Sequence, residues 1–333
     1  MSAPLRVLVA PDSFKGTFTA PQVAAAIGRG LEHGGLVPPD LCPVADGGEG
    51  TLAVLLTALG GETHGTTARD PLGRRDPAGF ALVDGGGTAI VEVAEASGLH
   101  RVAPIERDAF AASSAGTGDL VAAAIDQGAH VVLVAAGGSA TTDGGAGAIA
   151  AIEDAGGLRG AMLVVLTDVR TPFEDAARVF APQKGADAAT VERLTARLAA
   201  QALALPRDPR GVPGTGAAGG LAGGLWARYD AVLEPGAPFV LDQLDFDERL
   251  SRVDAVVVGE GRIDDQTRAG KVAGEISLRA ARAGVPVHAI VGEDDLDAAG
   301  RTALGLRSVR EASTLPALEA AGARLAALLL RER

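Results

Sequence analysis

The stretch Arg6-Val7-Leu8-Val9-Ala10-Pro11-Asp12-Ser13-Phe14-Lys15-Gly16-Thr17 decides the fold. Its first half is a short apolar run that predicts a buried β-strand, and its second half is a polar loop. A helix signal follows, because Thr19 and Gln22 stand at the spacing of a capping box and Pro21 falls in the first turn. The chain therefore opens with a strand–loop–helix unit whose loop lies near a helix N-terminus, which is a natural anion site.

The alternation of strands and helices continues along the chain. Residues 43–45 lead to the loop Asp46-Gly47-Gly48-Glu49-Gly50 and a second helix. Residues 80–83 and 89–93 predict the two strands of a hairpin. Further strands are predicted at residues 131–134, 162–166, 255–258 and 285–290, and further helices at residues 117–127, 144–152, 188–204, 217–228, 273–283 and 315–331. This pattern indicates the α/β class with mostly parallel sheets.

The length of 333 residues leaves room for two domains. We predict a discontinuous Rossmann/flavodoxin-like domain formed by both chain ends, residues 1–60 and 251–333. A second α/β domain, residues 61–250, is inserted between them. The hairpin belongs to the insertion, because it interrupts the regular βα alternation.

Composition and charge exclude several classes of protein. A single cysteine, Cys42, rules out an internal disulfide framework and indicates a reducing compartment, so we expect a cytoplasmic protein. No apolar run is long enough to span a membrane. The net charge of −12 disfavours nucleic acid and membrane partners. An anionic small-molecule substrate must therefore find its positive charge locally.

Local positive charge is available from three lysines, Lys15, Lys184 and Lys271, each next to a glycine. A lysine beside glycine can reach a phosphate across open backbone. The alternative interpretation is a composition that prefers arginine and leaves three lysines on the surface.

Four glycine-rich loops follow strand-like runs and carry carboxylates or hydroxyls. They span residues 12–16, 46–50, 137–145 and 259–266. At the carboxyl end of a sheet, such loops offer backbone N–H groups to phosphates, and their carboxylates suit Mg²⁺. A single glycine-rich loop is usually only a turn, but four of them together predict a phosphate site.

Standard nucleotide motifs are absent. A Walker loop would need glycine at position 265 and Ser or Thr after Lys271, where the chain has Asp265 and Val272. The five histidines lie outside the glycine loops, which weakens a serine hydrolase or a histidine metal site. For phosphoryl transfer, Asp46 and Asp143 are candidates for the carboxylate that orients or deprotonates the acceptor hydroxyl. Which of them is base and which is metal ligand stays open, and either could be a turn aspartate.

Six motifs in the same order resemble those of the bacterial glycerate kinase family. They cover nearly the whole chain: Ala10-Pro11-Asp12-Ser13-Phe14-Lys15-Gly16, residues 45–50, residues 137–145, Pro182-Gln183-Lys184-Gly185-Ala186, residues 216–220, and Gly259 to Thr267 followed by Gly270-Lys271.

The resemblance implies two α/β domains with the active site in the cleft between them. It implies transfer of the ATP γ-phosphate to D-glycerate with Mg²⁺, giving 2-phosphoglycerate more often than 3-phosphoglycerate. It leaves the oligomeric state open and is compatible with a homo-oligomer. We assign catalysis to Asp46, Asp143 and Lys15; substrate or phosphate binding to Asp12, Ser13, Gly47, Gly48, Gly137, Gly138, Ser139, Thr141, Lys184, Arg262 and Lys271; and metal binding to Glu49 and Asp264.

The chain departs from the family pattern at three places. Thr142 stands where the family usually has Asn, residues 153–160 replace a longer segment, and residues 167–173 differ from the usual motif. These differences leave two alternatives: a kinase of a related small hydroxy acid, and a non-catalytic sensor of a hydroxy acid or nucleotide. The glycine loops and all three lysines favour the kinase.

Overall fold

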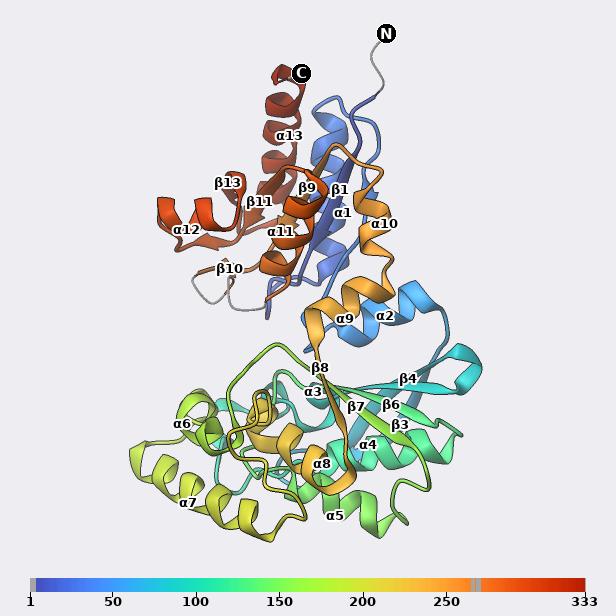
Figure 1. Cartoon of the computed structure of the whole chain (residues 1–333), viewed down its shortest axis with the longest axis vertical. Coiled ribbons are helices and arrows are strands. Elements are labelled where there is room, and N and C mark those ends of the chain that lie inside the picture. Colours follow the sequence, from blue (N-terminus) through green and yellow to red (C-terminus); the bar gives the residue numbers. More distant parts are fainter. Residues whose placement is uncertain (1–3, 265–266, 268–270, 333) are drawn as a thin grey trace. The chain divides into compact units, whose positions relative to one another are not determined.

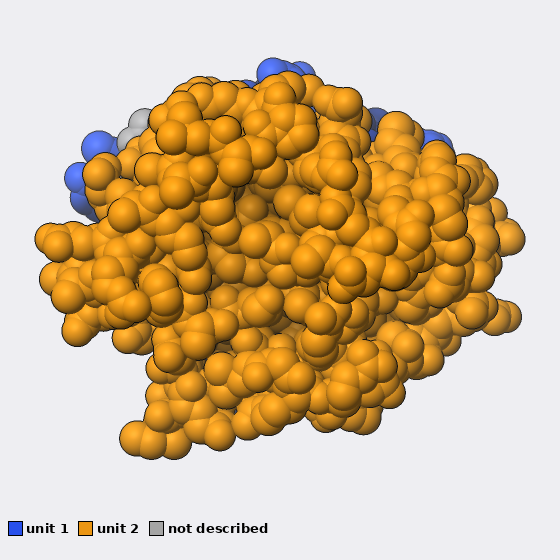
Figure 2. Space-filling model, turned by 90° about the horizontal axis from the view of Figure 1, so that it is seen from below, with its two compact units in different colours: residues 1–46, 237–333 blue, residues 47–236 orange. Residues whose placement is uncertain are grey.

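The computed structural model describes residues 4–264, 267 and 271–332. Asp265, Gln266 and Gly270, which belong to the last of the six sequence motifs, lie outside the described residues. The chain forms two compact units (Figures 1 and 2). Unit 1 consists of residues 1–46 and 237–333, and unit 2 of residues 47–236.

Unit 1 is built on a five-stranded parallel sheet in the order β13-β11-β9-β1-β2. Numbered along this unit alone, the order is 2-1-3-4-5, which is that of flavodoxin-like folds. The direction of winding reverses between β1 and β9, whose residues pair from Val7↔Ala255 to Pro11↔Gly259. The strands are β1 (Val7–Pro11), β2 (Asp40–Leu41), β9 (Ala255–Gly259), β11 (Val287–Val291) and β13 (Leu306–Glu311), with β10 (Arg262–Ile263) and β12 (Glu293–Asp294) as a small separate pair.

Helices cover both faces of this sheet (Figure 1). On one face, α1 (Ala20–His33) and α13 (Leu315–Arg331) share a core with alternate residues of β1 and β9, such as Val7 and Val257. The two helices approach so closely that a Cβ added at Gly30 would lie 2.0 Å from the backbone oxygen of Glu319. Against the other face packs α11 (Val272–Ala283), and α10 (Phe246–Leu250) packs on α11. The remaining helices of the unit are α9 (Gly236–Gln243) and α12 (Ala298–Ala303).

The start of α1 confirms the predicted capping box. Thr19 Oγ1 accepts a hydrogen bond from the Gln22 N–H at 3.4 Å, and Gln22 Oε1 accepts one from the Thr19 N–H at 2.9 Å. The loop of residues 12–18 is thereby fixed between the end of β1 and the first turn of α1.

Unit 2 is built on a six-stranded mixed sheet in the order β3-β4-β5-β6-β7-β8. The predicted hairpin is confirmed, because β4 (Arg75–Val83) and β5 (Thr88–Glu92) pair antiparallel. From β5 onward the strands are parallel, through β6 (Val131–Ala135), β7 (Met162–Thr167) and β8 (Val232–Pro235). One face carries α4 (Ala115–Asp126), α5 (Ala146–Asp154) and α8 (Leu221–Tyr229), and α2 (Thr51–Leu59) packs on β4 and β5.

A smaller core lies beside this sheet. It joins α6 (Ala176–Phe180) and α7 (Ala188–Ala204) around the fully buried ring of Phe173. The α7 residues Leu194, Leu198 and Ala202 face this core. The short helix α3 (Val93–Ser97) completes the α-helices of unit 2 in the described residues.

The predicted α/β class and the two α/β parts are confirmed, while several details differ. Strands β3 (Glu62–Arg69) and β13 escaped prediction because both are edge strands with mostly exposed or half-exposed residues. The single helix predicted at 217–228 is broken, because Ala218, Gly219 and Gly220 have positive φ before α8 begins.

The division into units falls at Asp46/Gly47 and Gly236/Ala237, whereas the sequence predicted 60/61 and 250/251. The helices between these boundaries explain the difference: α2 packs on the sheet of unit 2, and α10 packs on α11 of unit 1. None of the helices in the described residues is long and apolar enough to cross a membrane.

Candidate active site

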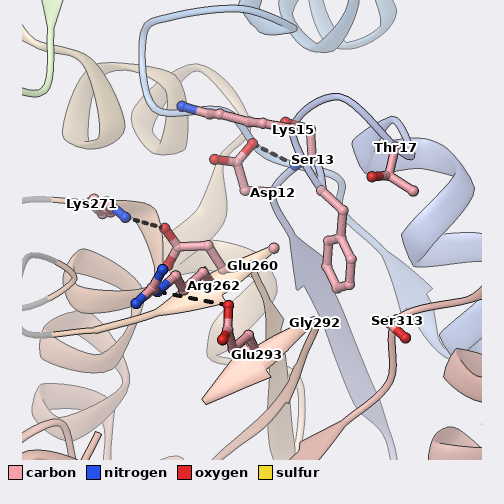
Figure 3. Close-up of a pocket in the computed structure, with 12 residues that line it drawn as sticks. Asp12, Ser13, Lys15, Thr17, Glu260, Arg262, Lys271, Gly292, Glu293 and Ser313 are labelled. Atoms are coloured by element: carbon pink, nitrogen blue, oxygen red, sulfur yellow. Dashed lines mark hydrogen bonds and ion pairs between the residues drawn. The ribbon is translucent and has the colours of Figure 1, made fainter. Parts of the chain in front are cut away.

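The carboxyl ends of β1 and β9 form the first part of the candidate site, in unit 1. A cavity of about 450 Å³ opens there, at the switch point where open α/β folds bind ligands (Figure 3). It is lined by Asp12, Ser13, Phe14, Lys15, Thr17, Glu260, Gly261, Arg262, Lys271, Gly292, Glu293 and Ser313. Five of the residues predicted from the sequence therefore meet here: Asp12, Ser13, Lys15, Arg262 and Lys271.

Two aspartates are buried beside this cavity. Asp12, immediately after β1, is 4% exposed, and its Oδ1 accepts a hydrogen bond from the Ser13 N–H at 2.6 Å. Asp46, before Gly47, is 3% exposed and pairs through Oδ2 with Lys15 Nζ at 2.6 Å. Burial raises the pKa of Asp12 well above its ordinary value, and the nearby charge of Asp46 adds to the rise. The Lys15 side chain is 56% exposed, so its ammonium links a buried carboxylate to the solvent.

Glu260, immediately after β9, is a third carboxylate, with a side chain 13% exposed, that the sequence reasoning did not single out. Lys271 Nζ lies 2.9 Å from its Oε1, and the two side chains point toward each other in Figure 3. Burial raises the pKa of Glu260, against the opposing effect of the Lys271 ammonium. Asp264 Oδ1 lies 4.0 Å from the same lysine nitrogen. Both lysines of the unit in the described residues are therefore held beside carboxylates, Lys15 beside Asp46 and Lys271 beside Glu260.

Arg262 is oriented differently from the lysines. Its guanidinium pairs with Asp295 and lies 3.9 Å from Glu293, and its side chain is 59% exposed (Figure 3). Its charge is therefore already balanced by two carboxylates of unit 1.

The glycine loop of residues 137–145 after β6 forms the second part of the candidate site, in unit 2. The N–H groups of Gly137, Gly138 and Ser139 donate to no acceptor within the described residues, and Gly138 is exposed. The loop backbone is held from one side, because Gly138 O accepts from the Leu99 N–H and the Ala140 N–H donates to Ser97 O, both at 2.8 Å. Three consecutive N–H groups are thus left without an acceptor in the described residues, at a turn where Gly138 is exposed, Gly137 is half-buried and Ser139 is buried. Such an arrangement suits phosphate oxygens.

The loop of residues 47–50 packs against this turn. A Cβ added at Gly137 would lie 2.6 Å from Gly48 Cα, so the two glycine-rich backbones are in direct contact. Glu49 Oε2 lies 3.6 Å from the place that a Cβ of Gly138 would take. Gly48 and Glu49 therefore border the same turn as Gly137 and Gly138, whereas Gly47 lies beside Gly236 and Leu166.

Asp143 is buried and saturated with hydrogen bonds. Its Oδ2 accepts from the Ser114 N–H and the Ser114 hydroxyl, both at 2.8 Å, and from the Gly147 N–H at 3.1 Å. Its Oδ1 accepts from the Gly145 N–H at 3.2 Å. These donors lie where α4 and α5 begin. The geometry favours a role in capping two helices over proton transfer at an open site.

Lys184 is buried, with only 3% of its surface exposed, and its ammonium group supports the loop of residues 137–145. Its Nζ donates to Ser139 Oγ at 2.9 Å and to the Thr141 carbonyl at 2.5 Å. Burial lowers the pKa of this ammonium to about 7, against the opposing effect of Asp143. Thr141 is fully buried, and its hydroxyl oxygen has no partner in the part of the chain that the structure describes.

A model of the glycerate kinase family matches residues 7–156 and 153–332, which together span nearly all of the sequence. The chain belongs to the glycerate kinase family. The resemblance drawn from the six motifs is confirmed, and family membership makes this chain an ATP-dependent phosphotransferase with an alcohol acceptor.

Named relatives agree with this family. A glycerate kinase of Halalkalibacterium halodurans is 38% identical over 324 residues, covering 86% of this chain and 85% of that protein. A glycerate 2-kinase of Escherichia coli K12 is 35% identical over 327 residues, with coverage of 86% and 85%. A crystal structure assigned as a glycerate kinase 2 of Salmonella typhimurium LT2 superposes with a TM-score of 0.82 at 32% identity, covering 99% of both chains.

The glycerate kinase motifs sort into two groups in the structure. Unit 1 gathers Asp12, Ser13, Lys15, Asp46, Arg262, Asp264 and Lys271, and unit 2 gathers Gly47, Gly48, Glu49, Gly137, Gly138, Ser139, Thr141, Asp143 and Lys184. The two expected metal ligands fall in different units, Glu49 in unit 2 and Asp264 in unit 1. Within the described ranges, no group of three or more His, Cys, Asp or Glu side chains is arranged to hold a metal ion.

Glu92 is another group that sequence reasoning missed. It ends β5, is 6% exposed, and accepts a hydrogen bond from the Leu52 N–H at 2.7 Å near the start of α2. Burial raises the pKa of Glu92 to about 7. The sequence does contain a signal for this residue, because the apolar strand Ala89-Ile90-Val91 ends in a charged side chain. A carboxylate at that position lies at the carboxyl end of the sheet, the edge to which the glycine loops belong.

Proposed function

We propose that this protein transfers the γ-phosphate of ATP to the 2-hydroxyl of D-glycerate, giving 2-phosphoglycerate and ADP. Family membership and the relative named glycerate 2-kinase support the choice of substrate and of the 2-position. The observation that carries phosphate binding is the accessible turn at Gly137, Gly138 and Ser139, with its three N–H groups free of acceptors in the described chain. Such N–H groups stabilise negative charge without moving during the reaction.

Lys15 and Asp46 are our proposed catalytic pair. The half-exposed lysine can turn from the carboxylate toward a phosphate, which leaves Asp46 to accept the proton of the substrate hydroxyl. In this step the hydroxyl oxygen bonds to the γ-phosphorus, the bond to the bridging oxygen breaks, and ADP leaves. Asp143 supports the reaction by holding the loop, since all four of its hydrogen bonds serve α4 and α5.

The other three basic residues of the predicted site have different surroundings, and we propose a different role for each. Lys271 lies in the cavity of unit 1, and we propose that it binds an anionic group there together with Asp12 and Ser13 as orienting residues. Arg262 retains a binding role only if a ligand displaces its two carboxylates. Lys184 acts on the loop rather than on the ligand, because it donates to two loop oxygens.

Magnesium fits this site as an ion that arrives with ATP. Mg²⁺ in kinases takes one or two carboxylates and fills its other positions with phosphate oxygens and water. The described residues, which hold no cluster of three such ligands, are therefore compatible with this ion. We propose Glu49 of unit 2 and Asp264 of unit 1 as separate candidates, either of which would supply such a carboxylate. The ion would neutralise charge on the phosphates.

Because ATP is an intracellular nucleotide, we propose that the reaction takes place in the cytoplasm.

The test is a coupled ADP-release assay with ATP, Mg²⁺ and D-glycerate, followed by ³¹P NMR of the product. Glycerate-dependent ADP with phosphate on carbon 2 supports the proposal, and phosphate on carbon 3 would correct the position. Turnover of only another hydroxy acid in a parallel panel would change the substrate. A folded protein that binds ATP or glycerate but turns over nothing would be a sensor.

A further inference from the structure

Three consecutive carbonyls of the glycine loop are held by three side chains of one neighbouring segment. Thr141 O accepts from Lys184 Nζ at 2.5 Å, Thr142 O from Arg197 Nη2 at 2.7 Å, and Asp143 O from Gln201 Nε2 at 2.9 Å. Lys184 precedes α7, and Arg197 and Gln201 stand one turn apart on it. We call these three side chains the carbonyl clamp.

The clamp is itself fixed in place. Asp187 caps α7 by accepting a hydrogen bond from the Thr190 N–H at 2.8 Å, and the helix is anchored by Leu194 and Leu198 in the small core. Arg197 also donates through Nη1 to Phe110 O at 2.7 Å, and its guanidinium lies 4.7 Å from the centre of the Phe110 ring. A guanidinium held at two carbonyls and one ring has little freedom to leave the loop.

The peptide geometry links this clamp to the accessible turn. In a trans peptide the carbonyl and the following N–H point in opposite directions, so these three bonds fix the peptides that end at the N–H groups of Thr142, Asp143 and Gly144. Lys184 extends the support to the turn itself, since the same nitrogen donates to Ser139 Oγ at 2.9 Å. The turn at Gly137, Gly138 and Ser139 is therefore tied to the clamp through the Ser139 side chain and through the fixed peptides that begin at Thr141, two residues after Ser139.

We propose that Arg197 and Gln201, with Lys184, are positioning residues that hold the glycine loop in its phosphate-binding shape. The inference rests on the proposed function, because it takes phosphate as the ligand of the turn. None of the three needs to touch the ligand. The clamp acts through the backbone of Thr141, Thr142 and Asp143.

The test compares Arg197→Met with Arg193→Met. Arg193 lies on the same helix over the same Phe110 ring, at 3.9 Å from its centre, but makes no hydrogen bond to the loop within the described residues. We expect Arg197→Met to raise the KM for ATP about tenfold with a smaller change in kcat, because one charge-assisted bond to the loop is lost. Arg193→Met should leave both constants unchanged. Arg197→Lys should restore most of the KM, since lysine can still donate to Thr142 O.

A second measurement does not require turnover. Hydrogen–deuterium exchange of the peptide 137–145, and the Kd of ADP by calorimetry, report the shape of the loop directly. Exchange should rise and affinity fall in Arg197→Met but not in Arg193→Met. If the wild-type chain fails to phosphorylate glycerate, the proposed function is wrong, but hydrogen–deuterium exchange and the Kd of ADP still test the clamp.

The clamp is overturned if Arg197→Met leaves exchange and ADP binding as in the wild type. It is equally overturned if both arginine variants lose affinity to the same extent, since the ring contact alone would then explain the effect. Should Arg197→Met fail to fold, Gln201→Leu removes the donor to Asp143 O at similar volume. The same exchange and binding changes are expected for that variant.

Discussion

Replacing Asp143 by Asn tests whether its carboxylate caps helices or takes part in catalysis. The side chain is 7% exposed and accepts four hydrogen bonds, three at Oδ2 and one at Oδ1. An asparagine can keep the three bonds at one oxygen, but its amide nitrogen then faces the Gly145 N–H. One bond is lost, and the others lose the charge of their acceptor. Since a hydrogen bond to a charged group contributes about 1.5–3 kcal/mol, we expect a loss of about 2–4 kcal/mol.

That free energy translates into a measurable change in Tm. For a unit of this size, each kcal/mol lowers Tm by roughly 2–4 °C, so Asp143→Asn should lower the Tm by roughly 4–16 °C. The assay is differential scanning calorimetry, with ADP release measured well below the new transition. We expect the folded variant to retain substantial kcat. A Tm within about 1 °C of the wild type, together with a loss of about 100-fold in kcat, would show that the carboxylate takes part in the chemistry and that our reasoning is wrong.

Three further predictions concern other residues. Asp46→Asn should lower kcat by about 100-fold or more at nearly unchanged Tm, as measured by ADP release and calorimetry. Because burial raises the pKa of Glu92 to about 7 from an ordinary 4.5, its proton stabilises the folded chain fully below pH 4.5, and this stabilisation is lost as the pH rises through 7. Glu92→Gln has no carboxyl group at this position to ionise. In urea unfolding, the free energy of unfolding of the variant should therefore rise by about 1–3 kcal/mol relative to that of the wild type between pH 5 and 8. Thr19→Ala should cost about 1 kcal/mol in urea unfolding, since it removes the acceptor for the Gln22 N–H.

Each of these has a result that contradicts it. Wild-type turnover in a folded Asp46→Asn protein would remove Asp46 from the proposed chemistry. A stability difference between Glu92→Gln and the wild type that stays constant with pH would mean that Glu92 keeps its charge in the folded state. For the capping box, Gln22→Ala is the matched variant. Thr19→Ala should lower the free energy of unfolding by as much as Gln22→Ala or by more.

Local signals in the sequence predicted much of the fold. The capping box at Thr19, the hairpin after Phe80 and the helices at 188–204 and 315–331 all depend on patterns a few residues long, and all are present in the structure. The strands β3 and β13 were missed because an edge strand buries little and therefore carries little apolar pattern.

The candidate site was less predictable, because its contacts are distant in sequence. Asp46 and Asp143 share an Asp-Gly-Gly context, yet one pairs with Lys15 and the other with Ser114. The shared Asp-Gly-Gly pattern does not show which aspartate has which partner. Arg197 lies 55 residues from the carbonyl that it binds, so only the packing of α7 reveals its role.

The pairing of β1 with β9 has a consequence for how the chain folds during translation. These two strands are neighbours at the centre of one sheet, and the Arg6 N–H donates to Asp254 across 248 residues of sequence. A nascent chain that has emerged only to Asp254 already contains the whole of residues 47–236, a continuous segment with its own core. Its first strand, by contrast, can pair only with β2. Val9 then has its partner Leu41 but lacks Val257, and Val7 lacks its partner Ala255. The inserted unit can therefore fold first, and the nucleus of unit 1 must wait for the last quarter of the protein to leave the ribosome.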